Sequence, residues 1–494
     1  MSATAEEVDW VDIDGGSSSC SSSGSSPPRE VVAMVGLPAR GKSCIAQKIS
    51  QYLNWAGTPT RVFNVGEYRR RESSPEMSDS SFFDSRNVHA ERLRSKYAKR
   101  ALKDLFAYLK RGTRRVAIFD ATNSTRERRE LLTSECQRRG FGIVFIESVC
   151  DDDGLVNANV LNAKIRGPDY EGSDVDAAAE DFFRRIAHYK ERYVPLNDDD
   201  DAQLSFMRVK DGGRAFDFTN IEGRLQSSLM NFVSRLRPGE RTFYFTRHGE
   251  SEFNRLGKLG GDSPLSPSGL KYAEALAKFF EWRRRQPSSS KVAVWTSGMQ
   301  RARQTAACLA PFASSIEVRL ELNEINAGVC EGMTYQEMKE KYPQEYEDRA
   351  NHKLQYRYPE GESYKDVVKR AESLVMELES REEEVVVVSH QAVLRCLLAY
   401  VRRIDREEMP HQRIPLHCLL RVRQSAEEVT VDHIHFGTPA VDTHWDPHAE
   451  EDDNVPPAAS PPPPPPMLLP SQKKGEDKRR APTRLRIKVS VELS

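Results

Sequence analysis

The chain has 494 residues, of which 38% are hydrophobic and 30% charged, and its formal net charge is −1. At roughly 100–200 residues per domain, this length predicts two or three domains rather than one core. The near-neutral charge excludes an overall field that would draw the chain to nucleic acid or to an anionic membrane. The acidic first residues do not resemble a signal peptide, and no segment approaches the ~20 apolar residues of a spanning helix. We therefore expect a cytoplasmic protein without membrane or nucleic-acid partners.

The cysteines and histidines give no metal signature. The eight cysteines lie far apart, without a C-x-x-C pair and without the Cys/His spacing of zinc sites. This pattern argues against a disulfide framework or a zinc site and favours a reducing compartment. Near the carboxyl end, His433 and His435 alternate within a predicted strand. We expect one of them to be exposed and assign neither to a metal.

The first half of the chain alternates between strand-like and helix-like segments. Residues 1–29 are acidic and then Ser/Gly-rich, a composition typical of disorder. Short apolar runs follow at residues 31–35, 62–65, 116–119 and 143–146, separated by helix-like segments such as 92–110. This alternation indicates an α/β domain with a parallel sheet. We expect it to cover residues 30–237, because Pro238-Gly239 ends an apolar helical stripe.

A second α/β series occupies the other half. Apolar runs at residues 242–245, 292–295 and 385–388 are again separated by helix-like segments, which predicts a second domain over residues 240–447. An acidic stretch, six consecutive prolines and a basic end follow, so residues 448–494 are expected to form a disordered tail. The two halves share no internal repeat and therefore are predicted to be different domains.

The first apolar run leads directly into a phosphate-binding motif. GLPARGKS matches G-x-x-x-x-G-K-[ST], in which backbone N–H groups surround the phosphates, Lys42 reaches the β/γ oxygens and Ser43 ligates Mg²⁺. The motif follows a predicted strand and precedes a helix-like segment, a context that a merely flexible glycine turn does not require. We expect Mg²⁺-dependent ATP binding here. The assigned residues are Gly36, Leu37, Pro38, Ala39, Arg40, Gly41, Lys42 and Ser43.

Charged residues at other strand ends indicate phosphoryl transfer to a second substrate. Asp120 ends the run at residues 116–119, where a carboxylate beside a P-loop can hold Mg²⁺ or take a proton from the acceptor hydroxyl. A turn or N-cap aspartate is the alternative. Arginines cluster at 69–71 and at 126, 128 and 129. Most arginine runs are solvated surface, but two runs just after strand ends favour the binding of an anionic substrate.

The second half carries the parts of a phosphohistidine site. Arg247-His248-Gly249-Glu250 directly follows a predicted strand. A histidine nucleophile that attacks phosphorus needs cations around the phosphoryl oxygens and an acid for the leaving alkoxide. Arg247 and Arg301 can clamp the phosphoryl group, His390 can donate a further hydrogen bond, and Glu324 is the candidate acid. Each residue alone could be a surface charge or a satisfied core histidine, but the ordered set at strand ends predicts a phosphatase.

Together these residues resemble the 6-phosphofructo-2-kinase/fructose-2,6-bisphosphatase family, from about Val31 to Pro447. The segments that carry the resemblance are GLPARGKS, RVFNVGEYRR, FDATNSTRERR, ESVCDDD, TRHGESEFN, GKLGGDS, LNEINAGVCEGMTY, RYPEGESY and SHQAVLRCLLAY. The resemblance implies a bifunctional enzyme that makes fructose 2,6-bisphosphate from fructose 6-phosphate and ATP and hydrolyses it back, controlling glycolysis and gluconeogenesis. It further implies a P-loop kinase domain, a phosphoglycerate-mutase-like phosphatase domain and a homodimer.

The resemblance also assigns individual residues. Asp120 and Cys150 belong to the kinase active site, His248 carries the phosphoryl group, and Glu324 donates the proton. Asn159 and Lys164 join the nucleotide set. The implied fructose 6-phosphate set is Arg69, Arg94, Thr122, Arg128, Lys164, Arg185 and Tyr189. The implied fructose 2,6-bisphosphate set is Arg247, Asn254, Gly260, Arg301, Tyr335, Arg349, Lys353, Tyr364, Gln391 and Arg395. Asn326 and Gly332 depart from the family pattern, in which acidic residues are common near the proton donor.

Three other hypotheses are open. One half alone could be active. A kinase–phosphatase that processes nucleic-acid ends is opposed by the neutral charge and by the lack of a basic groove with interleaved aromatics. An interaction protein that works through its Pro-rich tail is opposed by the presence of Lys42, Asp120, His248 and His390, which a scaffold does not need.

Overall fold

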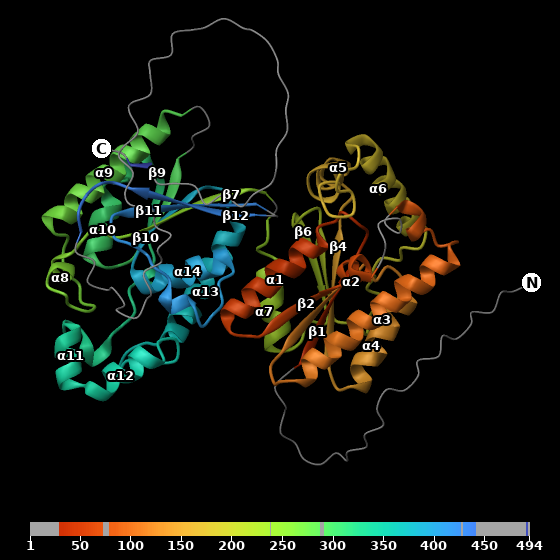
Figure 1. Cartoon of the computed structure of the whole chain (residues 1–494), viewed down its shortest axis with the longest axis horizontal. Helices are drawn as coiled ribbons and strands as arrows, with labels where there is room; N and C mark the ends of the chain where they lie inside the picture. The colour runs from red at the N-terminus through yellow and green to blue at the C-terminus, as the bar shows by residue number, and fades with distance from the viewer. Residues whose placement is uncertain are drawn as a thin grey trace, which may run out of the picture.

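The computed structural model describes residues 29–72, 79–237, 239–286, 291–425 and 428–440, and the backbone of Val491 and Glu492. Two helix-flanked sheets lie side by side, one built by each half of the chain (Figure 1). The prediction of two α/β domains is confirmed. The elements of the first half are β1 (Glu30–Val35), α1 (Lys42–Ala56), β2 (Thr60–Asn64), α2 (Val65–Glu72), η2 (Ser80–Phe83), α3 (Val88–Lys110), β3 (Val116–Asp120), α4 (Arg126–Arg138), β4 (Gly142–Val149), α5 (Asp153–Asn159), η3 (Val160–Lys164), α6 (Val175–Lys190), β5 (Phe206–Lys210), β6 (Ala215–Thr219) and α7 (Gly223–Val233).

The second half begins directly after α7. Its elements are β7 (Arg241–Arg247), α8 (Glu252–Arg255), α9 (Pro267–Arg284), β8 (Val292–Thr296), α10 (Gln300–Ala307), η4 (Ala310–Phe312), β9 (Ala313–Val318), η5 (Leu320–Leu322), η6 (Gly328–Cys330), α11 (Tyr335–Lys341), α12 (Pro343–Asn351), α13 (Tyr364–Ser380), β10 (Val385–Ser389), α14 (Gln391–Arg402), η7 (Met409–His411), β11 (Cys418–Gln424), β12 (Val429–His435) and β13 (Val491–Glu492).

The first sheet has the order β2-β3-β1-β4-β5-β6 and is parallel except for β6 at its edge. The side chains of β1 alternate between two cores. Val32 and Met34 pack with α1 and α7, whereas Val31, Ala33 and Val35 pack with α3 and α4. Covering on both faces explains why the strand is apolar from Val31 to Val35. Because the parallel strands end at the same edge, the P-loop after β1 lies beside Asp120 at the end of β3.

The second sheet has the order β13-β12-β11-β7-β10-β8-β9. Strands β7, β10, β8 and β9 are parallel, and β11 and β12 extend the sheet in antiparallel fashion. Helices α13 and α14 cover one face, and α9 and α10 cover the other. The two residues of β13 pair with β12. The expected disorder of residues 448–494 stays a prediction. The rest of that range, like residues 1–28, lies outside the described residues.

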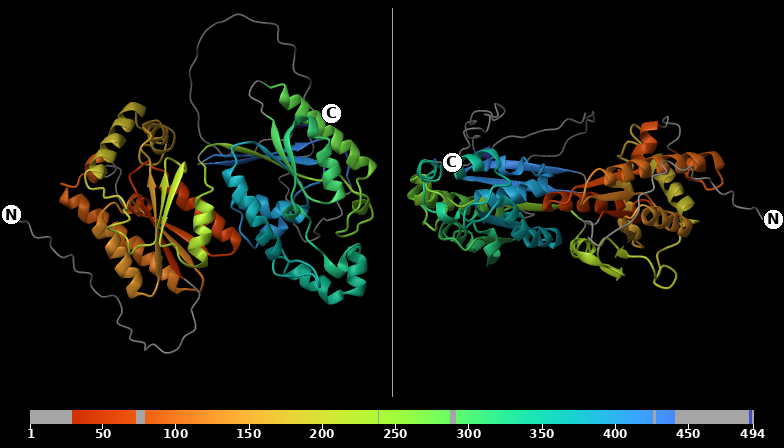
Figure 2. Two further views of the ribbon diagram at one scale, coloured as in Figure 1. Left: turned by 180° about the vertical axis from the view of Figure 1, so that it is seen from behind. Right: turned by 90° about the horizontal axis from the view of Figure 1, so that it is seen from below.

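One hydrophobic core connects the two halves. Helix α1 packs against α13 and α14 at the junction, as Figure 1 and the view from behind in Figure 2 both show. Trp55 donates from Nε1 to the carbonyl oxygen of Cys396 at 2.8 Å, and Gln51 donates to that of Tyr400 at 2.6 Å. Helix α1 begins at the P-loop and α14 begins next to His390. The two predicted sites are therefore joined through packed helices rather than through a linker alone.

The described part of the chain contains no helix that is both long enough and apolar enough to cross a membrane. The seven cysteines in it are free thiols.

Candidate active sites

The P-loop is held in a tight ring by its own backbone and by neighbouring side chains. Gly36, Ala39 and Gly41 have positive φ angles of 129°, 57° and 85°. A Cβ on Gly36 would lie 2.5 Å from the carbonyl oxygen of Ser148, so only glycine fits there. Asn159 donates to the carbonyl oxygen of Ala39 at 3.0 Å, and the Ser148 hydroxyl donates to that of Arg40. These contacts prearrange the loop for phosphate.

Lys42 turns back into this ring. Its Nζ donates to the carbonyl oxygen of Leu37 at 2.5 Å, and the side chain is buried. Burial lowers the pKa of Lys42 to about 7, although the nearby Asp120 carboxylate works in the opposite direction. A bound phosphate would place a negative charge beside the buried ammonium group of Lys42 and so compensate its positive charge.

Asp120 is held at the end of β3 by Asn64, whose side-chain amide donates to Asp120 Oδ2. Asp120 and Ser43 line the same cleft and offer a carboxylate and a hydroxyl, the oxygen ligands that Mg²⁺ prefers. The oxygen ligands of Asp120 and Ser43 therefore fit the expected Mg²⁺ ion. Sequence reasoning missed Asn64, although its position at the end of β2 could have indicated it.

This cleft brings the predicted kinase residues together. Its volume is about 620 Å³, which suits a nucleotide and a sugar phosphate side by side. Every residue implied for fructose 6-phosphate lines it, as do Asn159 and the P-loop from Pro38 to Ser43. Gly36 and Leu37 of the P-loop are not among the residues that line the cleft. The lining residues of the implied sugar set are Arg69, Arg94, Thr122, Arg128, Lys164, Arg185 and Tyr189.

Asp169 organises the cationic end of the cleft, and sequence reasoning missed it. Its carboxylate pairs with Arg69 at 2.5 Å, with Arg185 at 3.3 Å and with Arg70 at 3.5 Å. Burial opposes ionisation of this carboxyl, but the charges of Arg69, Arg185 and Arg70 outweigh it and hold the pKa of Asp169 below its ordinary value. The arginines are thereby fixed side by side, which is what recognition of a phosphate requires.

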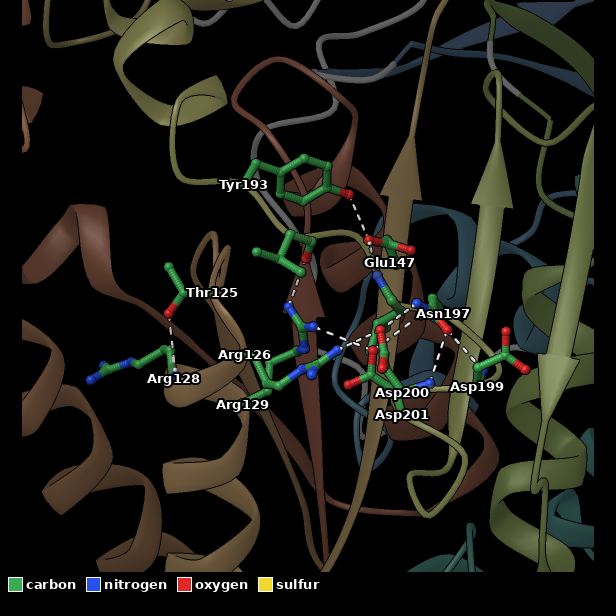
Figure 3. A network of polar contacts seen from close by, with 12 residues as sticks. Thr125, Arg126, Arg128, Arg129, Glu147, Tyr193, Asn197, Asp199, Asp200 and Asp201 are labelled. Carbon is green, nitrogen blue, oxygen red and sulfur yellow. Dashed lines mark hydrogen bonds and ion pairs between the residues drawn. The ribbon is translucent and has the colours of Figure 1, made fainter.

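The three arginines of the cluster at the start of α4 point in different directions, Arg126 and Arg129 toward Asp200 and Asp201 and Arg128 away from them (Figure 3). Arg129 is fully buried, donates to the carbonyl oxygen of Val194 at 2.9 Å and pairs with Asp201 at 3.4 Å. Arg126 pairs with Asp200 at 2.8 Å. Only Arg128 of the three lines the cleft. The expectation that the whole cluster binds an anion was wrong, because the aspartates before β5 take two of its members.

Cys150 lies just after β4 but outside the lining of the cleft. It is buried in an apolar cluster with Ala39, Val156 and Val160, and its Sγ faces the carbonyl oxygen of Asp152 at 3.8 Å. Burial raises the pKa of this thiol. Its surroundings are those of a packed side chain that supports the P-loop at Ala39, so its membership of the catalytic set remains a prediction.

His248 has a defined tautomer in the second site. Its Nδ1 lies 2.7 Å from the carbonyl oxygen of Gly249, which only accepts, so Nδ1 carries the proton. Its Nε2 accepts from Arg301 Nε at 3.0 Å, and a guanidinium only donates. The lone pair of Nε2 therefore points toward the cation that would hold a phosphoryl oxygen, as a nucleophile requires.

His390 stands behind His248, with 4.9 Å between the ring centroids. Its Nε2 contacts the Ser297 hydroxyl at 2.7 Å, and its buried Nδ1 has no hydrogen-bond partner in the described structure. Burial lowers the pKa of His390 well below its ordinary value, and the charge of Arg301 lowers it further. His390 is not among the residues that line the pocket around His248, so its contact with a ligand remains a prediction.

Glu324 is fixed at the start of α14. Its carboxylate accepts from the backbone N–H groups of Gln391 and Ala392, both at 3.1 Å, and from its own neighbour Ile325 at 2.9 Å. The helix that follows His390 thus also positions the candidate acid.

The second pocket gathers the remaining predicted residues. Arg349 donates to the phenol oxygens of Tyr358 and Tyr335 at 2.7 and 2.8 Å, and Arg395 donates to that of Tyr364 at 3.0 Å. These neutral partners orient the guanidinium groups and leave their positive charge available to an anion. The pocket is lined by His248, Glu324 and the implied bisphosphate set: Arg247, Asn254, Gly260, Arg301, Tyr335, Arg349, Lys353, Tyr364, Gln391 and Arg395.

Comparison with known proteins agrees with this geometry. Residues 18–238 match the family model of 6-phosphofructo-2-kinase, and residues 243–436 match that of the histidine phosphatase superfamily (branch 1). A 6-phosphofructo-2-kinase/fructose-2,6-bisphosphatase of Caenorhabditis elegans is 46% identical over 401 residues, covering 80% of this chain and 86% of its own. The chain belongs to the 6-phosphofructo-2-kinase/fructose-2,6-bisphosphatase family. Isoenzyme 1 of Homo sapiens is 44% identical over 415 residues, covering 84% of this chain and 86% of its own.

Two departures from the 6-phosphofructo-2-kinase/fructose-2,6-bisphosphatase pattern have local roles here. The Asn326 side chain accepts from the backbone N–H of Gly328 at 2.8 Å and so closes a turn. Gly332 has a φ of 75°, in the left-handed region that favours glycine. The loop between Glu324 and α11 is therefore shaped by backbone requirements at both positions.

Proposed function

We propose that this member of the family catalyses both of its reactions. The kinase domain transfers the γ-phosphoryl group of ATP to the 2-hydroxyl of fructose 6-phosphate. The phosphatase domain hydrolyses the fructose 2,6-bisphosphate formed and returns fructose 6-phosphate and phosphate. The observation that carries this proposal is the tautomer of His248: an Nε2 lone pair beside Arg301 shares its pocket with Glu324.

In the kinase cleft, the P-loop N–H groups and Lys42 bind the β- and γ-phosphates of ATP. Ser43 and Asp120 would hold Mg²⁺, which neutralises phosphate charge during transfer. Asp120 also accepts the proton of the sugar 2-hydroxyl as that oxygen attacks the γ-phosphorus. Arg69 and Arg185, fixed by Asp169, bind the 6-phosphate and aim the hydroxyl at the nucleotide.

In the phosphatase pocket, His248 Nε2 attacks the phosphorus of the 2-phosphate. The bond from phosphorus to the sugar oxygen breaks, and Glu324 gives that oxygen its proton. Arg247, Arg301 and His390 stabilise the charge on the phosphoryl oxygens. Water then attacks the phosphohistidine, giving its proton to Glu324 and releasing phosphate. Arg349, Lys353 and Arg395 would bind the non-reacting 6-phosphate.

Two labelling assays test the proposal. γ-Labelled ATP with fructose 6-phosphate should give labelled bisphosphate, and Lys42→Ala should abolish this product while the exposed Lys103→Ala leaves it unchanged. Bisphosphate labelled at the 2-position should place acid-labile label on the protein in a single turnover, and His248→Ala should remove it while the exposed His89→Ala does not.

The two outcomes are independent. Label on His248 without kinase product would leave a phosphatase with a silent P-loop domain, and no reaction in either assay would refute the sugar assignment. The family also suggests a homodimer in the cytoplasm. Light scattering on the purified chain should give twice the 56.1 kDa mass if the dimer forms.

A further inference from the structure

A cysteine and two histidines meet at the start of β11, outside both sites described above. Strand β12 carries His433 and His435 two residues apart, so both side chains point to the same face of the sheet. In the antiparallel register, Cys418 of β11 lies opposite His435, and Leu420 lies opposite His433. The Sγ of Cys418 and one ring nitrogen of each histidine lie within 4.8 Å of one another.

We propose that Cys418, His433 and His435 form a zinc site with a solvent molecule as its fourth ligand. Thiolate and imidazole are the ligand types that Zn²⁺ favours over the oxygen ligands of Mg²⁺. Ligands about 2.0–2.3 Å from a tetrahedral Zn²⁺ lie roughly 3.5 Å from one another. Cys418 Sγ and His435 Nε2 are already 4.0 Å apart. Small side-chain rotations therefore suffice to close the site.

The surroundings agree with a site that takes its ion from solution. Cys418 is buried, His435 is half-buried and His433 is exposed, which gives an ion an entry path and a place for water. Thiolate is the form of cysteine that binds a metal, so Cys418 must lose its proton to the solvent when the ion binds.

The position of the site gives it a structural consequence. Leu419 of β11 pairs with Thr246, the residue before Arg247 in the phosphatase pocket. The segment that leads into β11 supplies the carbonyl oxygen of Ile414 to Arg247 at 3.0 Å and the ring of His417 to the backbone N–H of Glu250 at 2.9 Å. A metal bound between β11 and β12 would hold β11 on the edge opposite β7 and would thereby stabilise the segment that leads into β11.

Cobalt substitution tests the site in the full chain. The chelator-treated protein should bind one equivalent of Co²⁺ with a thiolate-to-cobalt charge-transfer band, and Zn²⁺ should displace it. Co²⁺ at the Ser43 and Asp120 oxygens gives no such band, so the two sites are distinguishable. Zn²⁺ should also raise the Tm of the apo protein, because it binds the folded state.

Variants assign the ligands. Cys418→Ser should remove the band, and His433→Gln and His435→Gln should weaken Co²⁺ binding by roughly 100-fold or more, beyond what loss of a neighbouring contact costs. Cys308→Ser, at a half-buried cysteine elsewhere, and His89→Gln should leave the titration unchanged. If Cys418→Ser folds poorly, His433→Gln still tests the site, because His433 is exposed and its replacement should not disturb the core. A wild-type protein that gives no one-to-one band, or a band that survives in both Cys418→Ser and His433→Gln, would overturn the proposal.

Discussion

Removal of the Glu379 carboxylate should strongly destabilise the contact between the two domains. Glu379 of α13 is buried and accepts from Lys48 of α1 at 2.6 Å, from Arg241 at 2.7 Å and from the Tyr400 hydroxyl at 2.7 Å. The attraction of Lys48 and Arg241 outweighs the effect of burial and keeps the pKa of this carboxyl below its ordinary value. One carboxylate therefore neutralises two cations in the shared core.

The magnitude follows from the charges that remain. Loss of one partner of a buried ion pair costs about 3–5 kcal/mol, because the other charge stays buried without compensation. The Lys48 side chain keeps 13% of its exposure and can reach some solvent, so we expect about 3 kcal/mol for Glu379→Ala. The double variant Lys48→Met/Glu379→Ala should recover part of this loss, with a coupling energy of about 1–3 kcal/mol.

Urea unfolding, followed in parallel by fluorescence and by both catalytic activities, measures these free energies. Glu377→Ala is the matched control, since Glu377 lies on the same helix and forms only half-exposed pairs with Arg319 and Arg381; it should cost no more than about 1 kcal/mol. The contribution of Glu379 should be present above about pH 4.3 and fall as the pH drops further, because its pKa is lowered in the folded state. Equal costs for Glu379→Ala and Glu377→Ala would refute the reasoning.

Three further predictions concern the sites. Because burial lowers the pKa of Lys42 to about 7, the unfolded state binds more protons between about pH 7 and pH 10, and wild-type protein should gain stability over this range; urea titrations of Lys42→Met should lack this gain. Glu324→Gln should slow phosphohistidine formation by about 10²–10⁴-fold in rapid-quench assays, and an aryl phosphate with an acidic leaving group should be affected far less; equal slowing would exclude Glu324 as the acid. Asp169→Asn should raise the KM for fructose 6-phosphate by about tenfold, with the KM for ATP unchanged, because Arg69 and Arg185 lose their fixed positions; a lowered KM would mean that the carboxylate competes with substrate.

Sequence reasoning worked best where a function depends on consecutive residues. The P-loop is a local motif, and its strand and helix are predicted by apolar runs and periodicity alone. The same holds for Arg247-His248-Gly249-Glu250 after β7. Each motif sets its own backbone geometry within a few consecutive residues, so the sequence alone reveals it.

Sequence reasoning failed where packing decides the direction of a side chain. Arg126, Arg128 and Arg129 are nearly adjacent at the start of α4, yet only Arg128 reaches the cleft while the other two bind aspartates. A helix turns about 100° per residue, and which side faces the ligand depends on the sheet beneath it. Composition and spacing alone do not distinguish the three, and only the family resemblance singled out Arg128.

The sequence by itself determined the two domains, the order of their strands along the chain and the identity of the two catalytic motifs. Only the tertiary structure decided that Asp169 fixes Arg69 and Arg185, that Glu379 joins α1 to α13, and that Cys418 meets His433 and His435. Each group joins segments that lie at least fifteen residues apart in the sequence, and sheet register and helix packing bring them together. A pattern read along the chain reports the backbone that local propensity favours, whereas contacts between distant side chains exist only after the core has formed.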